Sequence, residues 1–281
     1  MPQLRQLMRH RFQEWQGQLP EPWHELLGGL DPAYDAIDQG ISIDEHQHIY
    51  PDNPFSLFSR LAPGQVRVIL LGEDPYPDAT RASGRAFEPA DLRRWQDAGR
   101  VPSSRRLAQQ LADFRHPQRD YALSRGGWRR LRRALTAVAP HVQLPTPEAT
   151  FDHWEAQGVL LLNTVLTASE NHIAEGDPGR GEHRKAHRSF WARLVQRICR
   201  RLADGDQATV FLCWGRRARD FVRTAGITTS TVCPFPVNPC CPATKVLVRD
   251  HPRVHSFLDS PNVFREANLA LTDLDAGEIQ W

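Results

Sequence analysis

Carboxylate, amide and imidazole side chains, which could take part in catalysis, lie at the ends of three short apolar segments of the chain. Glu73 and Asp74 follow residues 66–72, Asn163 ends residues 158–163, and His251 follows residues 245–250. A carboxylate can stabilise a developing cation, an imidazole can donate to a leaving group, and an amide offers a donor and an acceptor in one plane. Taken singly, Asp74 before a proline is more typical of a turn, and Asn163 of a loop cap. Their repeated position after apolar segments favours a shared site.

Four apolar segments predict the sheet that would bring these residues together. They are nearly continuously hydrophobic, as is typical of parallel strands covered on both faces, and comprise residues 66–72, 158–163, 209–215 and 245–250. Helical patterns at 104–114, 185–202 and 216–224 alternate with them. This alternation predicts an α/β fold, a three-layer αβα sandwich with a central four-stranded, mainly parallel sheet. Ligands of such sheets bind at the carboxyl ends of the strands.

Length and composition suit one globular domain. The chain has 281 residues, 40% of them hydrophobic and 24% charged, which excludes global disorder. We expect a single domain over 1–281, with an N-terminal helical extension (about 1–45) and an Arg-rich insertion (about 115–141). Long loops are expected at 171–182 and 227–244. The net charge of +2 neither indicates nor excludes a nucleic acid, so the clustering of arginines matters more.

The N-terminal segment and the cysteines bear on location and cofactors. The first 15 residues carry charges throughout, so we expect neither a signal peptide nor a membrane span, and a cytoplasmic, monomeric protein. Five cysteines without CxxC spacing are expected to be reduced thiols. A metal site at Cys233, Cys240 and Cys241 is the weaker alternative, because a second ligand pair is missing. We expect neither a metal nor an organic cofactor.

The polar segment ends lie inside longer motifs that resemble the uracil-DNA glycosylase family with a GQDPYH-type water-activating loop. The similarity runs in order over roughly two-thirds of the chain. Its motifs are IYPDNPFSLFSRL (49–61), GEDPYP (72–77) followed by Ala82, Gly84, Ala86 and Phe87, VPSSRRL (101–107), WEAQGVLLLNTVLT (154–167), FLCWGRRA (211–218), HP (251–252) and FREANLAL (264–271).

The resemblance implies hydrolysis of the N-glycosidic bond of a flipped-out pyrimidine, most simply uracil, in single-stranded or duplex DNA. The product would be an abasic site in base-excision repair. Asp74 would be the catalytic carboxylate beside the sugar, and His251 a neutral donor to the departing base. The base-binding residues would be Tyr76 as a wall beside the 5-position, Phe87 as a stacking face, Asn163 as the reader of the base edge, and Glu73.

Further residues are expected to contact DNA. Pro102, Ser103 and Ser104 match the family loop that presses on the backbone, although the two serines could also cap a helix beginning near residue 105. The remaining candidates are Arg253, His255, Arg129 and Arg130. The last two belong to the Arg-rich insertion, where arginines and aromatic residues interleave. This pattern favours phosphate binding, and a solvated helix face is the alternative.

Two departures from the family pattern leave the substrate open. Pro77 and Glu73 replace a histidine and a glutamine of the loop, and the segment HPRVHS lacks the leucine wedge. His255 would take the wedge position, with Val254 and Phe257 as neighbouring candidates.

These departures, with the Arg-rich insertion, favour a second hypothesis. It is excision of a modified pyrimidine, such as glucosylated hydroxymethylcytosine in phage DNA, as antiviral defence. Tyr76 and Asn163 favour uracil. A catalytically inactive DNA- or protein-binding module would be expected to lack Asp74 and His251, which are both present. An α/β hydrolase would need a G-x-S-x-G motif, which the chain lacks.

Overall fold

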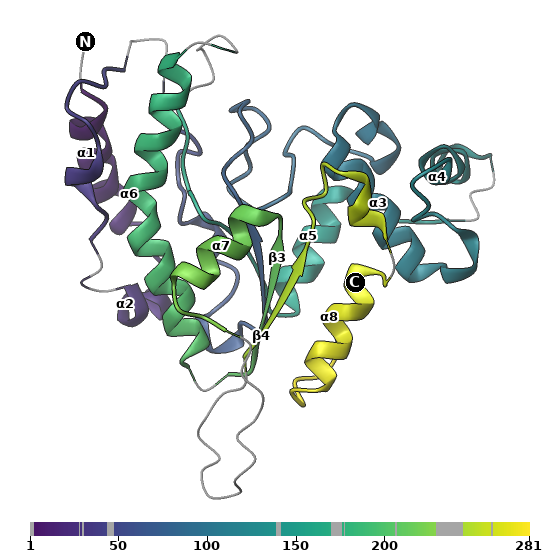
Figure 1. The fold of residues 1–281 in the computed structure, drawn as a ribbon. Helices are drawn as coiled ribbons and strands as arrows, with labels where there is room; N and C mark the ends of the chain where they lie inside the picture. Colours follow the sequence, from purple (N-terminus) through teal and green to yellow (C-terminus); the bar gives the residue numbers. More distant parts are fainter. Residues whose placement is uncertain are drawn as a thin grey trace, which may run out of the picture.

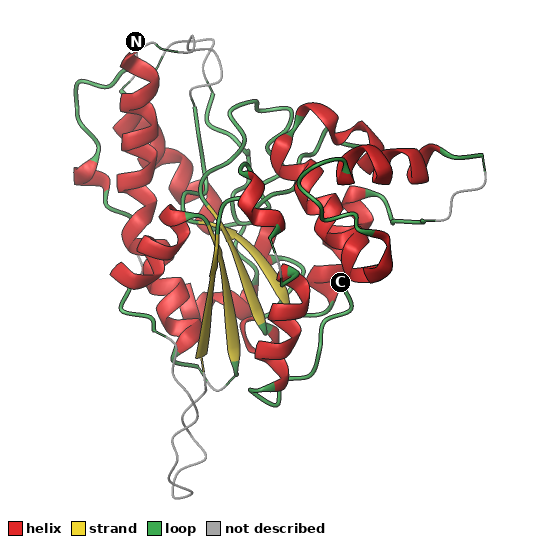
Figure 2. Cartoon of the chain, turned by 45° about the vertical axis from the view of Figure 1, so that its right-hand side comes forward, coloured by secondary structure: helices red, strands yellow, loops and turns green. Residues whose placement is uncertain are grey.

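Four parallel strands form the centre of the molecule (Figures 1 and 2). The computed structural model describes residues 3–27, 29, 31–43, 48–138, 142–169, 176, 178–205, 207–228, 244–259 and 261–281. The sheet order is β2-β1-β3-β4, and each neighbouring pair is parallel. The strands are β1 (Val68–Gly72), β2 (Val159–Asn163), β3 (Thr209–Trp214) and β4 (Thr244–Arg249). The predicted fold class is confirmed, and each strand lies within two residues of its predicted bounds.

Helices cover both faces of this sheet (Figure 1). On one face lie α1 (Leu4–Gln16), α2 (Glu21–Leu27), α6 (Pro178–Ala203) and α7 (Arg216–Thr224). On the other lie α3 (Pro102–Arg115), α5 (Pro147–Ala156) and α8 (Val263–Thr272), with α4 (Gly127–Thr136) beyond α3. The described parts of the connections contain short 3₁₀ helices at Tyr34–Ala36, Ser56–Phe58, Pro63–Gln65, Trp95–Arg100, Pro117–Arg119 and His255–Leu258.

Alternation along the strands divides the core into two layers. In β1, Ile69 and Leu71 pack into the layer beneath α1 and α6, whereas Val68 and Leu70 pack into the layer beneath α3, α5 and α8. Successive strand side chains point to opposite faces, so a strand that is buried on both sides reads as continuously apolar. This explains why the strand segments were visible in the sequence.

Two helices begin earlier than the sequence predicts. The segment 171–182 was expected to be a loop, yet α6 begins at Pro178. Proline suits the first turn of a helix, because its fixed φ is helical and the N–H it lacks would have had no partner there. The loop prediction is therefore wrong for residues 178–182, and residues 170–175 and 177 lie outside the described residues. Likewise, α3 begins at Pro102, where a start near residue 104 was expected.

The N-terminal and Arg-rich regions both carry helices. Helix α1 buries Leu4, Met8, Phe12 and Trp15 along one face, and Trp15 packs on Trp191 of α6 with ring centroids 5.9 Å apart. The Arg-rich region forms α4, and its residues 139–141 lie outside the described part of the chain. The domain bounds given above stay a prediction.

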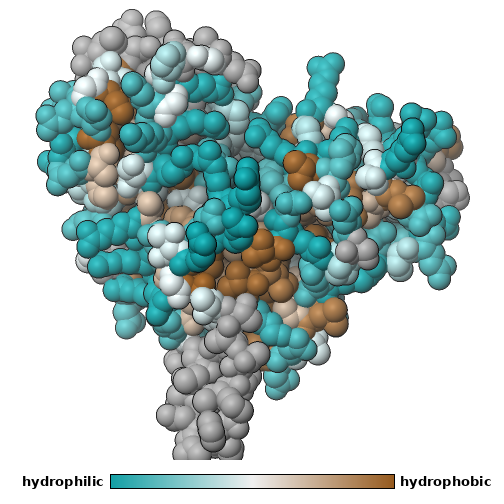
Figure 3. All heavy atoms as spheres, in the orientation of Figure 1, coloured by the Kyte–Doolittle hydropathy of each residue, from teal (hydrophilic) through white to brown (hydrophobic). Residues whose placement is uncertain are grey.

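The surface is mostly hydrophilic in the view of Figure 3, with an apolar area near the centre over the β4 side of the sheet. Strand β4 is an edge strand, and Val248 within it is 47% exposed. Among the described residues, no helix is long and apolar enough to cross a bilayer. Cys199 and Cys213 are buried free thiols, whereas Cys233, Cys240 and Cys241 lie outside the described residues.

Candidate active site

A cavity of about 320 Å³ opens at the carboxyl ends of the strands. This size lies within the range of small-ligand pockets. The residues that line it come from the ends of β1 and β2, from the segments following β1 and β4, and from the helices α3, α6 and α7. The sequence-predicted residues among them are Glu73, Asp74, Tyr76, Phe87, Ser103, Asn163, His251 and Arg253.

The loop after β1 is tied to the end of β2. The backbone N–H of Thr164 donates to the Gly72 carbonyl at 3.0 Å, and the Thr164 hydroxyl donates to the Glu73 carbonyl at 2.7 Å. On the far side of the loop, the Tyr50 hydroxyl donates to the Pro77 carbonyl at 3.1 Å. These bonds fix the backbone on both sides of Asp74, which lines the cavity.

Asn163 ends β2 directly beside Gly72 of β1. Its side chain is 3% exposed, and no other described residue forms a hydrogen bond with its amide. A Cβ atom at position 72 would lie 2.2 Å from Asn163 Oδ1, so glycine is needed for the amide to lie across the strand end. The amide lines the cavity, where a ligand edge with one donor and one acceptor would pair with it.

Phe87 and Tyr76 form apolar walls of the cavity. The Phe87 ring lies 5.2 Å from the Trp214 ring and 5.8 Å from the His251 ring, measured between centroids. The Tyr76 hydroxyl donates to the Phe87 carbonyl at 3.2 Å. Burial raises the pKa of Tyr76, and the hydroxyls of Ser103 and Ser104 act in the opposite direction. The tyrosine is therefore neutral at physiological pH and serves as a wall.

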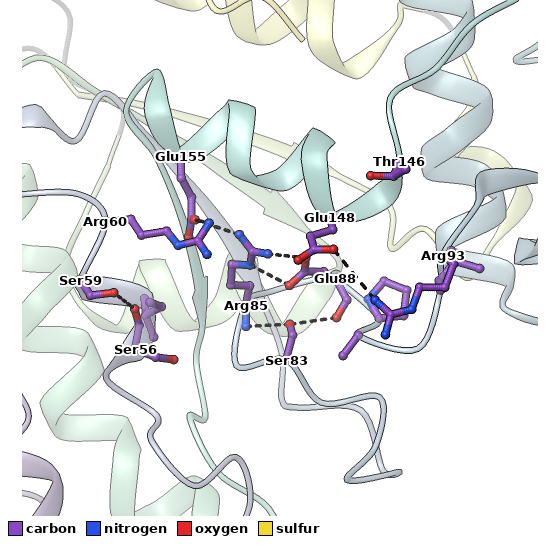
Figure 4. A pocket seen from close by; sticks show the side chains of 14 residues that line it. Ser56, Ser59, Arg60, Ser83, Arg85, Glu88, Arg93, Thr146, Glu148 and Glu155 are labelled. Carbon is purple, nitrogen blue, oxygen red and sulfur yellow. Dashed lines mark hydrogen bonds and ion pairs between the residues drawn. The ribbon is translucent and has the colours of Figure 1, made fainter.

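Phe87 has a φ of 65° and lies in the left-handed region, which costs a non-glycine residue on the order of 1 kcal/mol or more. A largely buried ion cluster beside it, which we call the Arg85 cluster, comprises Arg85, Glu88, Asp152 and Glu155, and Figure 4 shows all of these but Asp152. Arg85 Nε donates to Glu88 Oε2 at 2.7 Å, and its Nη1 donates to Asp152 Oδ1 at 2.6 Å and Glu155 Oε2 at 2.9 Å. The cluster ties the turn that carries Phe87 to α5.

A second cavity, of about 520 Å³, lies on the other side of this cluster (Figure 4). Arginines and glutamates line it, and they pair largely with each other: Arg85 with Glu88 and Glu155, and Arg93 with Glu148. It is larger than the cavity at the carboxyl ends of the strands, which we call the strand-end cavity, but none of the predicted catalytic residues lines it. The strand-end cavity is therefore the candidate active site.

His251 follows β4 by two residues and is held as a neutral imidazole. The backbone N–H of Arg253 donates to His251 Nδ1 at 3.0 Å. Nδ1 is thus an acceptor, and the ring proton of the neutral form resides on Nε2, which is available as a donor. Burial, aided by the charge of Arg253, lowers the pKa of His251 to about 4.

Arg106 of α3 positions the segment that carries His251, and sequence reasoning missed it. Its Nη1 donates to the carbonyl oxygens of Pro252 at 2.9 Å and Arg253 at 2.5 Å. The side chain is buried, and burial lowers its pKa. The only sequence signal is its place in the motif VPSSRRL, where Arg105 carries the same side chain.

Three further arginines were also missed, and they approach the two carboxylates after β1. Arg217 Nη1 lies 2.7 Å from Glu73 Oε1, and Arg188 Nη2 lies 3.6 Å from the same atom. Arg184 Nη2 lies 3.4 Å from Asp74 Oδ2. Glu73, expected to bind the base, is thus engaged by cations from α6 and α7.

Several predicted residues lie outside the cavity. Ser104 is 1% exposed in the first turn of α3, and its predicted contact with DNA stays a prediction. Ser104 is not a helix cap, since Val101 takes that position. Phe257 is buried against Trp214, at 5.0 Å between centroids, and cannot be a wedge. The exposed candidates away from the cavity are Pro102, Val254, His255, Arg129 and Arg130.

Comparison with known proteins gives the family. The sequence model of the Uracil DNA glycosylase superfamily matches residues 58–272. The chain belongs to this superfamily. It is 30% identical over 205 residues to a uracil-DNA glycosylase of Bordetella avium, covering 72% of this chain and 65% of that protein. It is 28% identical over 269 residues to one of Enterococcus faecalis, covering 92% and 94%. The match covers 65% of the length of the Bordetella avium and Bordetella parapertussis relatives.

Solved structures support the superfamily fold. The UNG crystal structure of Nitratifractor salsuginis superposes with a TM-score of 0.60 at 21% identity, covering 96% of this chain and 98% of that one. A mimivirus UNG variant gives a TM-score of 0.58 at 17% identity, covering 95% and 90%. The resemblance that the sequence motifs indicated is confirmed at the level of family and fold.

Proposed function

We propose that this protein hydrolyses the N-glycosidic bond of uracil in DNA and leaves an abasic site, as in base-excision repair. The observation that carries the proposal is the buried amide of Asn163, which lines a cavity shared with Asp74 and His251. The planar amide matches the donor and acceptor on the edge of uracil and opposes the edge of cytosine. The relatives named uracil-DNA glycosylase favour uracil over a modified pyrimidine.

In the proposed reaction, the sugar develops positive charge while the base departs as an anion. The Asp74 carboxylate stabilises the cation and orients the attacking water. His251 donates from Nε2 to the base oxygen, and the Arg253 N–H at Nδ1 keeps the ring in this tautomer. Phe87 stacks on the flipped base, and Tyr76 closes the cavity beside it.

DNA contacts outside the cavity are a further part of the proposal. Arg253 and His255 lie on the exposed segment after β4, and Pro102 lies at the exposed start of α3. Arg129 and Arg130 lie on the exposed side of α4, where they would reach DNA beyond the flipped nucleotide. Monomeric action and a cytoplasmic location stay predictions.

The test is incubation with oligonucleotides that carry one deoxyuridine, single-stranded and duplex, followed by alkaline cleavage at abasic sites. Asp74→Asn is expected to lower the rate on the order of 10²–10³-fold, since a charge aimed at the transition state is lost. Asp78→Asn is the matched control, because Asp78 lies in the same loop but bonds to Thr80. Equal activity of wild type and Asp74→Asn would contradict the mechanism, and cleavage of modified-cytosine DNA alone would contradict the substrate.

A further inference from the structure

Helix α6 reaches the proposed catalytic carboxylate. Arg184 and Arg188 lie one helical turn apart, so both point toward the loop after β1, where they pair with Asp74 and Glu73 respectively. Arg217 approaches Glu73 from α7. Arg184 and Arg217 line the same cavity as Asn163, so a nucleotide in the cavity would lie beside them.

A buried hydrogen-bond chain fixes the position of this part of α6. His183 Nε2 must donate to the Ser42 carbonyl, at 3.1 Å, because a carbonyl only accepts. For neutral rings, the Ser169 hydroxyl then donates to His183 Nδ1 at 2.8 Å, and His187 Nε2 donates to Ser169 at 2.8 Å. The Thr167 hydroxyl donates to His187 Nδ1 at 2.9 Å and accepts from Trp191 Nε1 at 2.6 Å. We call these five side chains the histidine chain.

The histidine chain sets which side of α6 is buried. His183 and His187 immediately precede Arg184 and Arg188 in the sequence, so burial of the two rings directs the two guanidinium groups to the neighbouring side of the helix. The packing of α6 therefore determines that Arg184 and Arg188 lie over the loop after β1.

The contact of Arg184 with Asp74 conflicts with the proposed role of Asp74. A guanidinium beside the carboxylate opposes the positive charge that develops on the sugar. The pair is also weakly held, since the side chains of Arg184 and Asp74 are 40% and 19% exposed and their closest atoms are 3.4 Å apart. Such pairs contribute little to stability, so another anion can replace the carboxylate at small cost.

We propose that Arg184 is a DNA-phosphate-binding residue that exchanges Asp74 for a phosphate flanking the flipped nucleotide. This inference rests on the proposed glycosylase function. A phosphodiester carries a full negative charge and accepts two parallel N–H bonds from one guanidinium. DNA binding then removes the opposing charge from Asp74 at the moment the sugar arrives. Arg188 and Arg217 keep Glu73 paired during this exchange.

The test replaces single phosphates around deoxyuridine with neutral methylphosphonates in a single-stranded oligonucleotide and measures kcat/KM. Wild type is expected to lose on the order of tenfold at one phosphate, on either the 5′ or the 3′ side. Arg184→Met is expected to lose a similar factor on unmodified DNA and to show no further loss at that phosphate. Arg184→Lys, which keeps the charge, should recover part of the activity.

Arg197→Met is the matched control, because Arg197 is an exposed arginine of the same helix. It should keep the wild-type response at each phosphate. Arg184→Met that stays as sensitive as wild type at every position would overturn the inference. If the wild-type protein excises no base, the proposed function is contradicted. The inference about Arg184 is then tested by the salt dependence of DNA binding. The slope of log Kd against log salt should fall by about 0.7 in Arg184→Met relative to Arg197→Met, and equal slopes would overturn it.

Discussion

At the scale of single residues, the proposed mechanism assigns base recognition to Asn163 and stabilisation of the departing base to His251. Asn163 presents a buried amide to the cavity, and His251 presents a neutral ring whose Nδ1 is already occupied. Each property depends on a neighbouring group that takes no part in the proposed reaction. Gly72 leaves room for the amide, and the backbone of Arg253 sets the tautomer.

Changing the amide of Asn163 to a carboxylate should remove uracil recognition while keeping the side-chain shape. We expect Asn163→Asp to lower kcat/KM for uracil-containing DNA on the order of 10²–10³-fold, because its N–H donors are replaced by a second oxygen. Thermal unfolding of the variant reports whether the fold is retained. A folded variant with wild-type kcat/KM would remove Asn163 from base recognition.

The pKa of His251 should be measurable by NMR and should lie near 4. The active neutral ring is then present at physiological pH, and kcat/KM should fall only as the pH drops through about 4. Because Arg253 contributes to this shift through its charge, Arg253→Met should raise the pKa of His251 while keeping the backbone bond to Nδ1. A pKa near 6.5 in wild type would contradict the neutral-donor role.

At the scale of elements, hydrophobic periodicity predicted the strands and the residues at their ends. It did not predict which groups the long arginine side chains contact. Asp74, Asn163 and His251 could be placed together because parallel strands end at one edge of the sheet. The contacts of Arg85, Arg106 and Arg184 could not be predicted from the sequence. Lysine and arginine together number 35, and only tertiary packing decides which of them reaches a carboxylate or a carbonyl.

The start of α6 and the burial of Phe257 were missed for related reasons. Two glycines around Pro178 resemble a turn, although proline also suits a first helical turn. Phe257 could be assigned to the surface only by its place in a motif, whereas the structure packs it on Trp214. The position of Phe257 is thus determined by a neighbour distant in the chain.

The Arg85 cluster should act on catalysis through Phe87. Arg85→Lys keeps the charge but loses the paired hydrogen bonds to Glu88, so we expect kcat/KM to fall by about tenfold and the free energy of unfolding by about 1–2 kcal/mol. In a Phe87→Leu background the loss of stability should persist, but the further loss of kcat/KM should disappear. Independent, additive effects on kcat/KM would show that Arg85 does not act through Phe87.

At the scale of the whole molecule, the histidine chain joins three distant parts of the sequence. It connects Ser42 of the N-terminal region, the segment after β2 and the helix α6. It therefore ties α6, which covers one face of the sheet (Figure 1), to the segment after β2 and to the N-terminal region. The stability of that face should depend on the protonation of its rings.

Acid should destabilise the protein through His187. Burial, together with His183, lowers the pKa of His187 to about 3, whereas the ring of an unfolded chain titrates near 6.5. The unfolded state therefore binds more protons between these values, and the free energy of unfolding should fall as the pH drops from about 6.5 to about 3, by a few kcal/mol at most. Denaturant unfolding measures this dependence.

The matched variants isolate the contribution of His187. His187→Gln should lower stability at neutral pH and flatten the dependence on pH below about 6.5, most clearly below pH 4, where His251 has already titrated. His153→Gln, at an exposed position on α5, should leave it unchanged. Identical pH dependence in wild type and His187→Gln would show that His187 does not titrate in this way.

The histidine chain also constrains how this sequence can change over evolution. Each described bond donates toward the next member, so the chain runs in a single direction from Trp191 to the Ser42 carbonyl. Loss of His187 or Thr167 removes a hydrogen bond from the neighbour on each side. The positions 167, 169, 183 and 187 should therefore be inherited as a set, and descendants that lose one should have replaced the others with apolar side chains.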